Sequence, residues 1–599
     1  MEELKNQLSY KIISQDVNDF VKSSLKGYLG FGNENDEHEY ITKAKIIHDP
    51  IWGSTEYEAW EMQIIDSPLI QRLRNISQVG LAVLTYPAAR HSRFEHTLGV
   101  AAVTKRLVNR ININCAKSGE NFHDIKEPVK CKLILAAIMH DVGHCFYSHL
   151  SESVYGDLED FVKLKTKINE IYGLSPKPHE ILSFIIVNCD SFKDFFRKKV
   201  CYPYKDDLDE LFEDVGKIII GKNIEKGTVV ESYQTSIING DFDADKLDYI
   251  KRDSYTAGLS LDFDIERLFT KIKICDVDIK DNFRDTNFNK ERRLVIEASG
   301  VTAIEELTFC KIMLYSYIYH HQKVLITEDM IKDYVQGLLE LKIIKSYADF
   351  LRFDETILLE LSKKQGNRKP FPKYGEIDLE LLANNIRNRI LPKRCFEISR
   401  TFVKEIAQNE NKNRNEALAN LLIKIRNSND KDYKEEDFEK DIKSFPDICA
   451  QEHIAGCMQK FEKKTFKNIL ITRKKIYKEL CNIYKTKGKT VDFSVFDIYC
   501  VFPKQVSYGS SIGGDNVVWK KVIGKKKVEG EKKEDFTSIA KFVKLGEWAN
   551  TFNAYKWRGY VYVTEKIDKD LAYIASQQVI FKELQKELQK ELQSALQKS

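Results

Sequence analysis

Two adjacent residues able to bind a metal ion, His140 and Asp141, end an apolar run in the first half of the chain. An imidazole and a carboxylate at one point of the backbone suit a divalent cation, and burial penalises the carboxylate unless a cation compensates its charge. His96 lies upstream of this pair and Asp245 lies far downstream. A single His-Asp pair occurs by chance in many chains, whereas the ordered set is much more specific. We therefore predict a metal site whose ligands are His96, His140, Asp141 and Asp245.

The composition of this ligand set indicates which ions it would prefer. Two imidazoles with two carboxylates favour a borderline or hard divalent metal such as Mn, Fe, Mg or Ni over a thiolate-preferring ion. The alternative is a set of buried polar residues satisfied by the backbone, which is more plausible for one histidine than for the whole set. His144 and His149 follow the pair closely, so they can face the same cavity, and His179 adds a third imidazole. Near neutral pH a histidine can supply a proton beside a metal, which is chemistry suited to hydrolysis.

The elements that must position these residues are predicted to be helices. Leu133–Met139 is a continuous apolar run with helical flanks, so we interpret it as a buried helix rather than a strand. Ser92 followed three residues later by Glu95 fits a capping box, which would put His96 in the first turns of a new helix. The pattern from Asp49 to about residue 340 is mostly helical, so the first half of the chain should be a helical core.

The composition of the chain limits its class and environment. A chain of 599 residues exceeds the size at which one hydrophobic core keeps growing. The formal net charge of +4 argues against a dominant polyanion-binding surface, but it permits local basic pockets for phosphates. The twelve cysteines are scattered and form no CxxC pair, which favours reduced thiols. The N-terminus lacks an apolar leader, and no run is long enough to span a bilayer, so we expect a cytoplasmic protein without a membrane partner.

The pattern changes along the chain, and four consecutive segments are expected. They are an accessory N-terminal arm (1–39), a helical core (40–340), a more charged helical extension (341–485) and a smaller C-terminal α/β lobe with a terminal helix (486–599). Strand-like runs at Phe493–Phe502 and Tyr560–Val563 mark the lobe. The mixed-charge segment Lys525–Lys533 fits a solvated loop, or alternatively a site for an anionic effector. Leucines four apart from Leu584 predict a short terminal helix that packs on its own body or on a neighbouring subunit.

The ordered motifs resemble those of one known family. In order, they are Asp49-Pro50-Ile51, Ile65-Asp66-Ser67-Pro68, Gln71-Arg72-Leu73-Arg74, His91-Ser92-Arg93-Phe94-Glu95-His96, His140-Asp141-Val142-Gly143-His144, Ser148-His149, His179-Glu180, Asp245-Lys246-Leu247-Asp248-Tyr249 and Arg252-Asp253. The chain resembles the HD-domain phosphohydrolases, and within them the deoxynucleoside triphosphate triphosphohydrolases, which include the bacterial dGTPases and the SAM-and-HD-domain dNTPase. The resemblance spans roughly the first half of the chain and implies an HD-domain helical core for residues 40–340.

The resemblance also implies roles for individual residues around a scissile phosphate. In the family, residues that match His144, His149 and His179 surround this phosphate and stabilise charge or protonate the leaving oxygen. Glu152 stands where the family usually has an aspartate, so the charge is kept on a longer arm. Arg93 and Lys246 would contact phosphates, a role that suits the fork of an arginine, although surface ion pairs are the alternative.

The sugar of the substrate has its own expected contacts. By resemblance, Gln78 and Asp253 would hold the 3′-hydroxyl, Tyr249 would pack on the sugar, and Val79 would crowd a 2′-hydroxyl. Close relatives supply an arginine for the triphosphate and a tyrosine over the sugar from the region of Tyr315 to Lys323. Here the positions that align with them are Ile312, with Lys311 beside it, and His320, and Lys323 is a further candidate contact. An aromatic stripe at this spacing is more often core than site.

A second nucleotide site is implied by four further positions. Lys45, Asp66, Gln71 and Arg74 match residues that hold a guanine nucleotide effector between subunits in regulated relatives. A structural helix at residues 71–74 is the alternative. The effector interpretation predicts a homo-oligomer whose activity changes when nucleotide binds.

The expected function is metal-dependent hydrolysis of a dNTP to deoxynucleoside and triphosphate. One alternative is an HD phosphodiesterase or nuclease, but the near-neutral charge and the lack of a long basic stripe argue against nucleic acid as the main partner. Another alternative is a nucleotide sensor that binds without catalysis, which the complete set of ligands and histidines makes less attractive.

Overall fold

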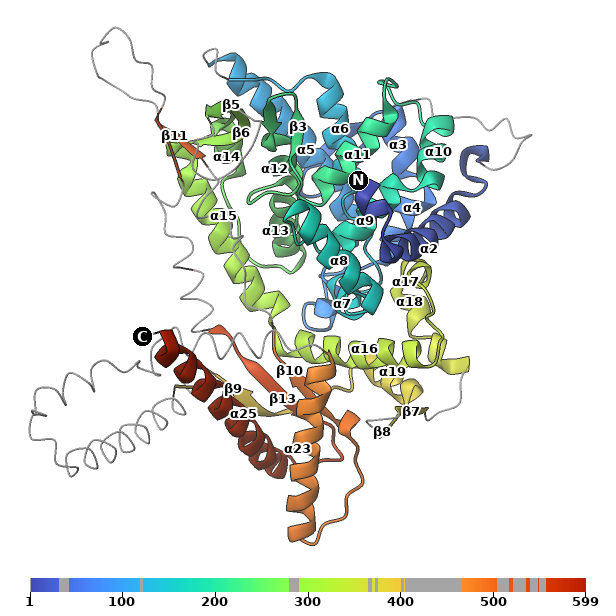
Figure 1. Ribbon diagram of the computed structural model, residues 1–599, viewed down its shortest axis with the longest axis vertical. Helices are drawn as coiled ribbons and strands as arrows, with labels where there is room; N and C mark the ends of the chain where they lie inside the picture. Colours follow the sequence, from blue (N-terminus) through green and yellow to red (C-terminus); the bar gives the residue numbers. More distant parts are fainter. Residues whose placement is uncertain are drawn as a thin grey trace, which may run out of the picture. The chain divides into compact units, whose positions relative to one another are not determined.

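The computed structural model describes residues 2–31, 43–118, 122–278, 290–364, 369–371, 375–399, 403–404, 466–503, 517–520, 535–538, 548 and 556–598 (Figure 1). These residues belong to two compact units. The first unit lies within residues 1–324, 331–365 and 507–549, and the second within 325–330, 366–506 and 550–599. The predicted mainly α class with a smaller α/β portion is confirmed. The division into four consecutive segments stays a prediction.

The first unit is built from helices around an apolar centre. Its α-helices are α1 (Glu2–Lys5), α2 (Leu8–Leu25), α3 (Ala59–Ile65), α4 (Pro68–Gln71), α5 (Arg93–Ala116), α6 (Glu127–Met139), α7 (His149–Tyr155), α8 (Glu159–Tyr172), α9 (Pro178–Asn188), α10 (Asp190–Lys199), α11 (Leu208–Ile219), α12 (Ser232–Ile238), α13 (Ala244–Thr256), α14 (Ile265–Lys271), α15 (Val301–Leu314), α16 (Gln322–Glu340, shared with the second unit), α17 (Tyr347–Arg352) and α18 (Glu355–Leu358). Shorter 3-10 helices are η1 (Tyr28–Gly30), η2 (Arg72–Asn75), η3 (Gly80–Leu84), η4 (Ala298–Gly300) and η6 (Leu361–Lys364), and η5 (Tyr315–Tyr319) is a π-helix.

Helices α5 and α6 form the centre that positions the site. The predicted buried helix is confirmed as α6, in which every residue from Cys131 to Met139 is buried. The predicted capping box at Ser92 and Glu95 is also confirmed and starts α5. Helix α5 packs against both α6 and α13, which brings segments far apart in the sequence together (Figure 1).

Two sheets flank the helices of the first unit. Strands β1 (Lys45–Asp49) and β2 (Gly53–Tyr57) form an antiparallel hairpin. Among the described residues, a six-stranded sheet has the order β12-β11-β6-β4-β3, with β5 also paired to β6. Its strands are β3 (Ile224–Lys226), β4 (Val229–Glu231), β5 (Ile272–Asp278), β6 (Lys290–Glu297), β11 (Val517–Lys520) and β12 (Asp535–Ser538).

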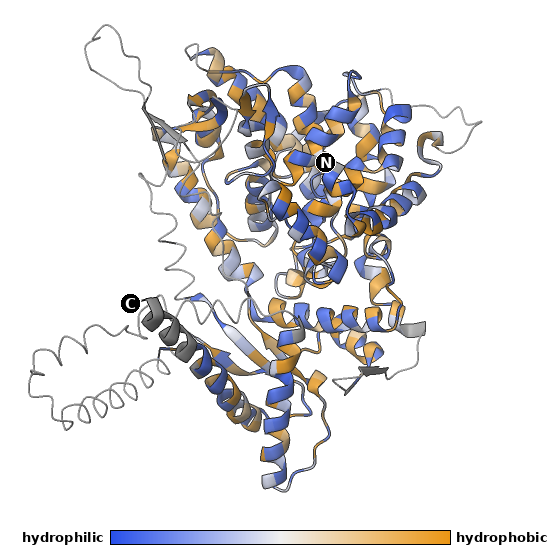
Figure 2. Ribbon diagram, viewed as in Figure 1, coloured by the Kyte–Doolittle hydropathy of each residue, from blue (hydrophilic) through white to orange (hydrophobic). Residues whose placement is uncertain are grey.

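The second unit contains a small antiparallel sheet with the order β10-β13-β9. Its elements are β7 (Lys369–Phe371), β8 (Gly375–Ile377), α19 (Leu379–Arg387), β9 (Lys393–Ile398), α23 (Phe466–Thr486), η7 (Val495–Asp497), β10 (Ile498–Val501), β13 (Gly559–Val563) and α25 (Lys569–Lys598). Helices α23 and α25 pack on each other and place apolar residues such as Leu480 and Leu571 in a core with the strands (Figure 2). The predicted strands at 493–502 and 560–563 are thus confirmed, although the first begins as a 3-10 turn.

Residues at the N-terminus differ from the expected accessory arm. Helix α2 buries Ile13, Val17 and Phe20, and it packs against α8, α9, α10 and α17. The stretch from Gly27 expected as loop contains η1.

Three other sequence features can be placed only in part. The segment Lys525–Lys533 lies outside the described residues. The terminal helix is present as α25, which at 30 residues is longer than the short helix predicted, and Leu584 in it is buried. The side chains of its later leucines lie outside the described residues. No helix in the described part of the chain is long and apolar enough to cross a membrane.

Candidate metal and catalytic site

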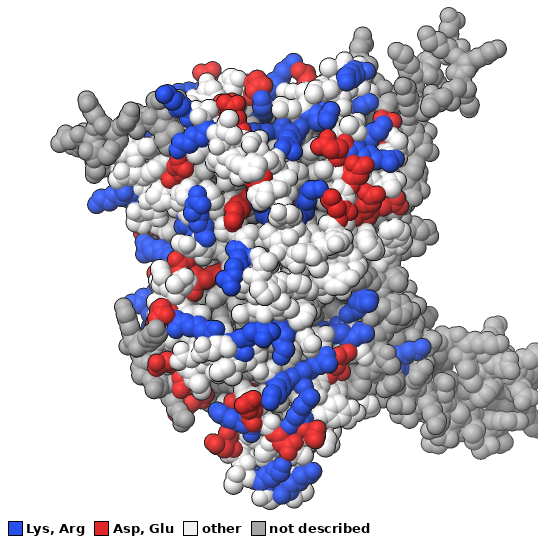
Figure 3. All heavy atoms as spheres, turned by 180° about the vertical axis from the view of Figure 1, so that it is seen from behind, with Lys and Arg blue, Asp and Glu red and all other residues white. Residues whose placement is uncertain are grey.

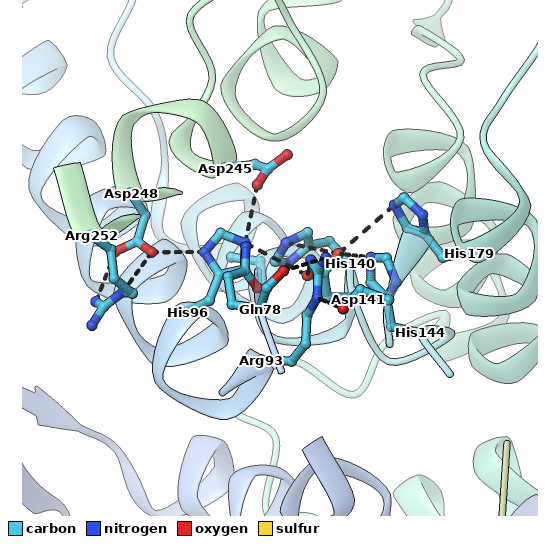
Figure 4. A network of polar contacts seen from close by, with 12 residues as sticks. Gln78, Arg93, His96, His140, Asp141, His144, His179, Asp245, Asp248 and Arg252 are labelled. Atoms are coloured by element: carbon cyan, nitrogen blue, oxygen red, sulfur yellow. Dashed lines mark hydrogen bonds and ion pairs between the residues drawn. The ribbon is translucent and has the colours of Figure 1, made fainter. Parts of the chain in front are cut away.

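The four predicted metal ligands come together from three helices. His96 lies in the first turn of α5, His140 and Asp141 follow directly after α6, and Asp245 lies in the first turn of α13. His96 Nε2 is 3.0 Å from Asp245 Oδ1 and 3.6 Å from Asp141 Oδ2, and His140 Nε2 is 3.4 Å from Asp141 Oδ1 (Figure 4). The side chains of all four therefore converge on one point.

The donor atoms at this point fit a divalent cation. His96 Nδ1 lies 2.7 Å from Asp248 Oδ2, and His140 Nδ1 lies 2.7 Å from the carbonyl oxygen of Ala137. Both Nε2 atoms are buried and face carboxylate oxygens of Asp245 and Asp141, but neither makes a well-aligned hydrogen bond within the described residues. An imidazole whose Nδ1 is held by an acceptor and whose Nε2 is left for a ligand is the usual arrangement around a metal. The residues present thus suit a metal of the predicted kinds.

A buried ion pair fixes the carboxylate that orients His96. Arg252 donates to both oxygens of Asp248 at 2.9 Å and also contacts Asp49 at 2.8 Å. Burial alone would raise the pKa of Asp248, but Arg252 and His96 lower it to about 2. This pair lies directly against α5 at Gly99, where a Cβ would be 1.9 Å from Asp248 Oδ1. Glycine is therefore required there for the pair to approach the helix.

The candidate catalytic residues surround one carboxylate oxygen. Glu152 Oε1 lies 2.9 Å from His149 Nδ1, 2.8 Å from His179 Nδ1 and 3.3 Å from His144 Nδ1. The rings of His144 and His179 stack with centroids 3.8 Å apart. Although burial opposes its ionisation, the neighbouring imidazoles hold the pKa of Glu152 well below its usual range. The structure thus brings the four predicted residues together, and the longer arm of glutamate reaches all three rings.

Asp141 joins the histidine cluster to the metal ligands. Its Oδ1 lies 3.3 Å from His144 Nε2 and 3.9 Å from His179 Nε2 (Figure 4). Its Oδ2 accepts a 2.6 Å hydrogen bond from Arg93 Nη1. Burial raises the pKa of Asp141, but His140 and Arg93 outweigh this effect and keep the carboxyl ionised. One carboxylate therefore faces both groups of histidines.

Arg93 links Asp141 to the loop before α7. Its Nε donates to Ser148 Oγ at 2.8 Å, and its Nη2 lies 3.5 Å from the carbonyl oxygen of Gln78. The side-chain oxygen of Gln78 is buried without a hydrogen-bond partner among the described residues. Val79, beside it, is buried at the start of η3.

The candidate sugar contacts lie around Asp253. Asp253 Oδ1 is 2.7 Å from His91 Nε2, and Tyr319 donates a short hydrogen bond to Asp253 Oδ2. Burial raises the pKa of Tyr249, which shares the surroundings of this carboxylate. His320, the predicted position, instead has its ring against Tyr315, with centroids 5.5 Å apart.

The π-helix η5 explains why Tyr319, rather than its neighbour His320, contacts Asp253. A π-turn adds one residue to the helical register, and here it ends at Tyr319. This addition turns Tyr319 toward Asp253, which an alignment by spacing alone assigns differently. Lys323 is the second residue of α16, and its backbone N–H donates to His321 Nδ1 at 3.2 Å.

Three lysines near the predicted metal ligands, Lys177, Lys246 and Lys311, are close enough to affect one another's charge. Lys246 Nζ donates to Gly240 O and Asp243 Oδ2, each at 2.6 Å. Burial together with the charges of Lys246 and Lys177 lowers the pKa of Lys311 to about 8. Sequence reasoning assigned no role to Lys177, although its place two residues before His179 was a usable signal.

The four candidate effector residues lie on β1 (Lys45), at the end of α3 (Asp66), on α4 (Gln71) and on η2 (Arg74). Lys45 Nζ is 2.9 Å from Asp66 Oδ2, and Arg74 Nε donates to Gln71 Oε1 at 2.7 Å while its guanidinium stacks 3.7 Å from the ring of Phe94. The structure therefore joins them as two pairs.

Arg72, on the same short helix η2 as Arg74, makes different contacts. Its half-buried guanidinium donates to the carbonyl oxygens of His144, at 2.8 Å, and of Val142. It thus touches the backbone that carries the His-Asp pair.

Comparisons with known proteins agree with this geometry. Residues 93–187 match the HD domain, and residues 263–431 match the HD associated region. An uncharacterised protein of Methanocaldococcus jannaschii is 28% identical over 372 residues, which cover 60% of this chain and 67% of that protein. The deoxynucleoside triphosphate triphosphohydrolase SAMHD1 homolog of Dictyostelium discoideum is 27% identical over 415 residues, which cover 65% of this chain and 69% of that protein. A solved phosphohydrolase structure from Bacteroides thetaiotaomicron has a TM-score of 0.51 at 16% identity, covering 87% of this chain and 100% of that one, and bears on the fold alone. The chain therefore carries a match to the HD domain and to its associated region, and over about two thirds of its length it is similar to a deoxynucleoside triphosphate triphosphohydrolase homolog.

Proposed function

We propose that this protein hydrolyses deoxynucleoside triphosphates to deoxynucleoside and triphosphate. The observation that supports this most is the meeting of two groups at Asp141. On one side lie the donor atoms suited to a metal, and on the other lie three imidazoles held by Glu152. A divalent ion bound by His96, His140, Asp141 and Asp245 would supply Lewis-acid stabilisation of charge on phosphate oxygens.

Glu152 prepares the histidines for proton transfer. Because its Oε1 faces their Nδ1 atoms, Nε2 is the atom left to exchange a proton with substrate. The side chain of His149 is 63% exposed, so it is accessible to a bound nucleotide. We therefore assign it as the general acid that protonates the leaving 5′-oxygen, with His144 and His179 stabilising the phosphate.

The cations around the site favour a substrate with a polyphosphate chain. Arg93 offers a guanidinium beside Asp141, and Lys246, Lys177 and Lys311 add ammonium groups close enough to repel one another. Three linked phosphates would offset this repulsion, whereas a single phosphodiester would offset less of it.

The sugar side of the proposed site favours deoxyribose. Asp253, held by His91 and Tyr319, and the side-chain oxygen of Gln78, which has no partner among the described residues, are acceptors for a 3′-hydroxyl. Val79 would crowd a 2′-hydroxyl. Because Tyr319 rather than His320 contacts Asp253, we propose Tyr319 as the aromatic cover of the sugar.

A second nucleotide near Lys45, Asp66, Gln71 and Arg74 would regulate a homo-oligomer. Asp66 and Arg74 carry opposite charges, Gln71 adds an amide, and Lys45 could meet a phosphate. A nucleotide bound there can activate only if it prefers the competent assembly to the idle one.

The test is product analysis with the purified full chain, Mn²⁺ or Mg²⁺, and three classes of substrate. Each dNTP, a single-stranded oligonucleotide and a cyclic dinucleotide would be incubated separately and the products separated by anion exchange. We expect deoxynucleoside and inorganic triphosphate from a dNTP, lost in Asp141→Asn and kept in the exposed control Glu159→Gln.

Other products would overturn the proposal in defined ways. Nucleoside monophosphates from the oligonucleotide or the cyclic substrate would identify a nuclease or phosphodiesterase. On the face drawn in Figure 3, acidic and basic side chains of the described residues are both spread over the surface. Binding of dNTP without any product would identify a sensor.

A further inference from the structure

The turn that precedes His149 has an unusual backbone. Tyr147 and Ser148 have φ angles of 51° and 52°, in the left-handed region that residues other than glycine rarely adopt. Ser148 combines its φ with a ψ of −121°, which is unfavourable for a residue with a Cβ. Two such residues in succession persist only when surrounding contacts hold them. The turn leads directly into α7, which carries His149 and Glu152.

One carboxylate from a distant segment holds this turn. Glu355 Oε1 accepts hydrogen bonds from the backbone N–H groups of Tyr147, at 3.1 Å, and of Ser77, at 2.9 Å. Its Oε2 accepts from Ser77 Oγ at 2.6 Å. Glu355 begins α18, more than 200 residues away in sequence, within the stretch that matches the HD associated region.

The contact continues from Ser77 to the proposed metal ligands. Ser148 Oγ donates to the carbonyl oxygen of Ser77 at 2.6 Å and accepts from Arg93 Nε at 2.8 Å. Arg93 in turn donates to Asp141. The carboxylate of Glu355 therefore stands at the outer end of a hydrogen-bonded chain that ends at Asp141.

We propose that Glu355 is a positioning residue that fixes the Tyr147–Ser148 turn and so places His149 for catalysis. This inference rests on the proposed function, because it assigns a purpose to the placement of His149. It also gives the HD associated region a direct task in the reaction. Glu355 touches no ligand of the proposed metal site, so its removal should leave metal binding unchanged.

The side chain of Glu355 does not serve as the N-terminal cap of α18. The cap is Asp354, whose side chain accepts from the N–H of Ile357 at 2.8 Å. Within the described part of the chain, the three hydrogen bonds of the Glu355 side chain go to the two loops at residues 77 and 147. Asp354→Asn is therefore a matched control, because it removes the neighbouring negative charge, keeps a side-chain acceptor for the cap of α18 and leaves the turn untouched.

The first experiment measures the turn itself, independently of any substrate. Hydrogen–deuterium exchange of peptides spanning residues 75–79 and 145–150 would be followed in wild type, Glu355→Ala, Glu355→Gln and Asp354→Asn. We expect exchange to accelerate by roughly tenfold or more in Glu355→Ala, because a hydrogen bond to a charged group is lost at both loops. Glu355→Gln keeps an acceptor for the two N–H groups and should stay within a few-fold of wild type.

The second experiment measures turnover at saturating dNTP with metal content checked in parallel. A displaced catalytic group costs roughly ten- to a hundredfold, so kcat should fall by that factor in Glu355→Ala with metal retained. Glu355→Gln should rescue most of kcat, and Asp354→Asn should keep it. Should Glu355→Ala not fold, Glu355→Asp serves, because its shorter arm cannot reach both loops.

The outcomes separate the two proposals. Unchanged hydrogen–deuterium exchange in Glu355→Ala would overturn the proposal that Glu355 fixes the Tyr147–Ser148 turn, whatever the substrate is. Faster exchange with unchanged kcat would overturn its role in positioning His149, as would an equal loss of kcat in Asp354→Asn. A wild-type protein that hydrolyses no dNTP would refute the proposed function. It would also refute the catalytic purpose assigned to Glu355, even if the exchange data confirmed that Glu355 holds the turn.

Discussion

Replacing Gly99 by alanine should weaken metal binding although Gly99 is not a ligand. Gly99 lies one turn after His96 on α5, against the Asp248–Arg252 ion pair. An added Cβ would be 1.9 Å from Asp248 Oδ1 and 2.4 Å from Arg252 Nη2. Both distances are far shorter than van der Waals contact, so the carboxylate and the guanidinium must move.

The size of the effect follows from the contacts that this movement breaks. Asp248 must retreat by roughly an ångström or more to reach normal contact distance, which breaks its 2.7 Å contact with His96 Nδ1. Loss of such an orienting partner lowers metal affinity by about 10- to 100-fold, or about 1.4–2.7 kcal/mol. Disturbing the buried pair costs a further ~3–5 kcal/mol of stability, offset by ~1 kcal/mol from the better helix propensity of alanine.

Calorimetric titration with Mn²⁺ and urea unfolding of the metal-free protein would measure the two effects. Gly216→Ala is the control, because its Cβ would meet side chains of Asn188 and Phe184 in another part of the helical core. We expect both variants to lose stability, but only Gly99→Ala to lose metal affinity. Wild-type affinity in a folded Gly99→Ala variant would refute the reasoning that Asp248 orients His96.

Three further results are expected. His149→Ala should keep its metal and slow turnover by roughly a hundredfold, as quench-flow with metal analysis would show; near-normal kcat would remove it as the acid. Burial raises the pKa of Glu355 from 4.5 to about 7. The stability of the folded state is therefore reduced progressively as the pH rises from about 4.5 to 7, and the reduction is complete above pH 7. Glu355→Gln should therefore gain stability over wild type, by at most about 3 kcal/mol above pH 7 and by little below pH 5; urea curves with a constant difference would contradict this. Asp66→Ala with Arg74→Ala should keep basal dNTP hydrolysis but lose any response to a second nucleotide, and a retained response would place the effector elsewhere.

The order of motifs was sufficient to name the residues that meet in space around Asp141. His96, His140 and Asp245 could be grouped because residue type and order carry that information. The start of α5 was also predictable, because a capping box is a local pattern that needs only four residues.

Contacts that depend on tertiary structure could not be predicted in this way. Nothing near Glu355 in the sequence indicates that it reaches Ser77, 278 residues away. The π-turn before His320 shifts the register by one residue, which spacing alone cannot reveal, so Tyr319 was overlooked. The N-terminal residues gave no local sign that α2 would be buried, because its partners lie on helices far along the chain.

Helix η2 limits which sequence changes this protein can accept during evolution. It is only four residues long, yet Arg74 belongs to the proposed effector site and Arg72 holds the backbone beside the His-Asp pair. A substitution that shortens a side chain at 74 can alter one site alone. An insertion, a proline or a rotation of this turn would move both arginines together, and the carbonyl oxygens of Val142 and His144 would lose their donor. Substitutions of side chains on η2 can therefore change the proposed effector site without changing the catalytic site. A change in the backbone of η2 would alter both sites together.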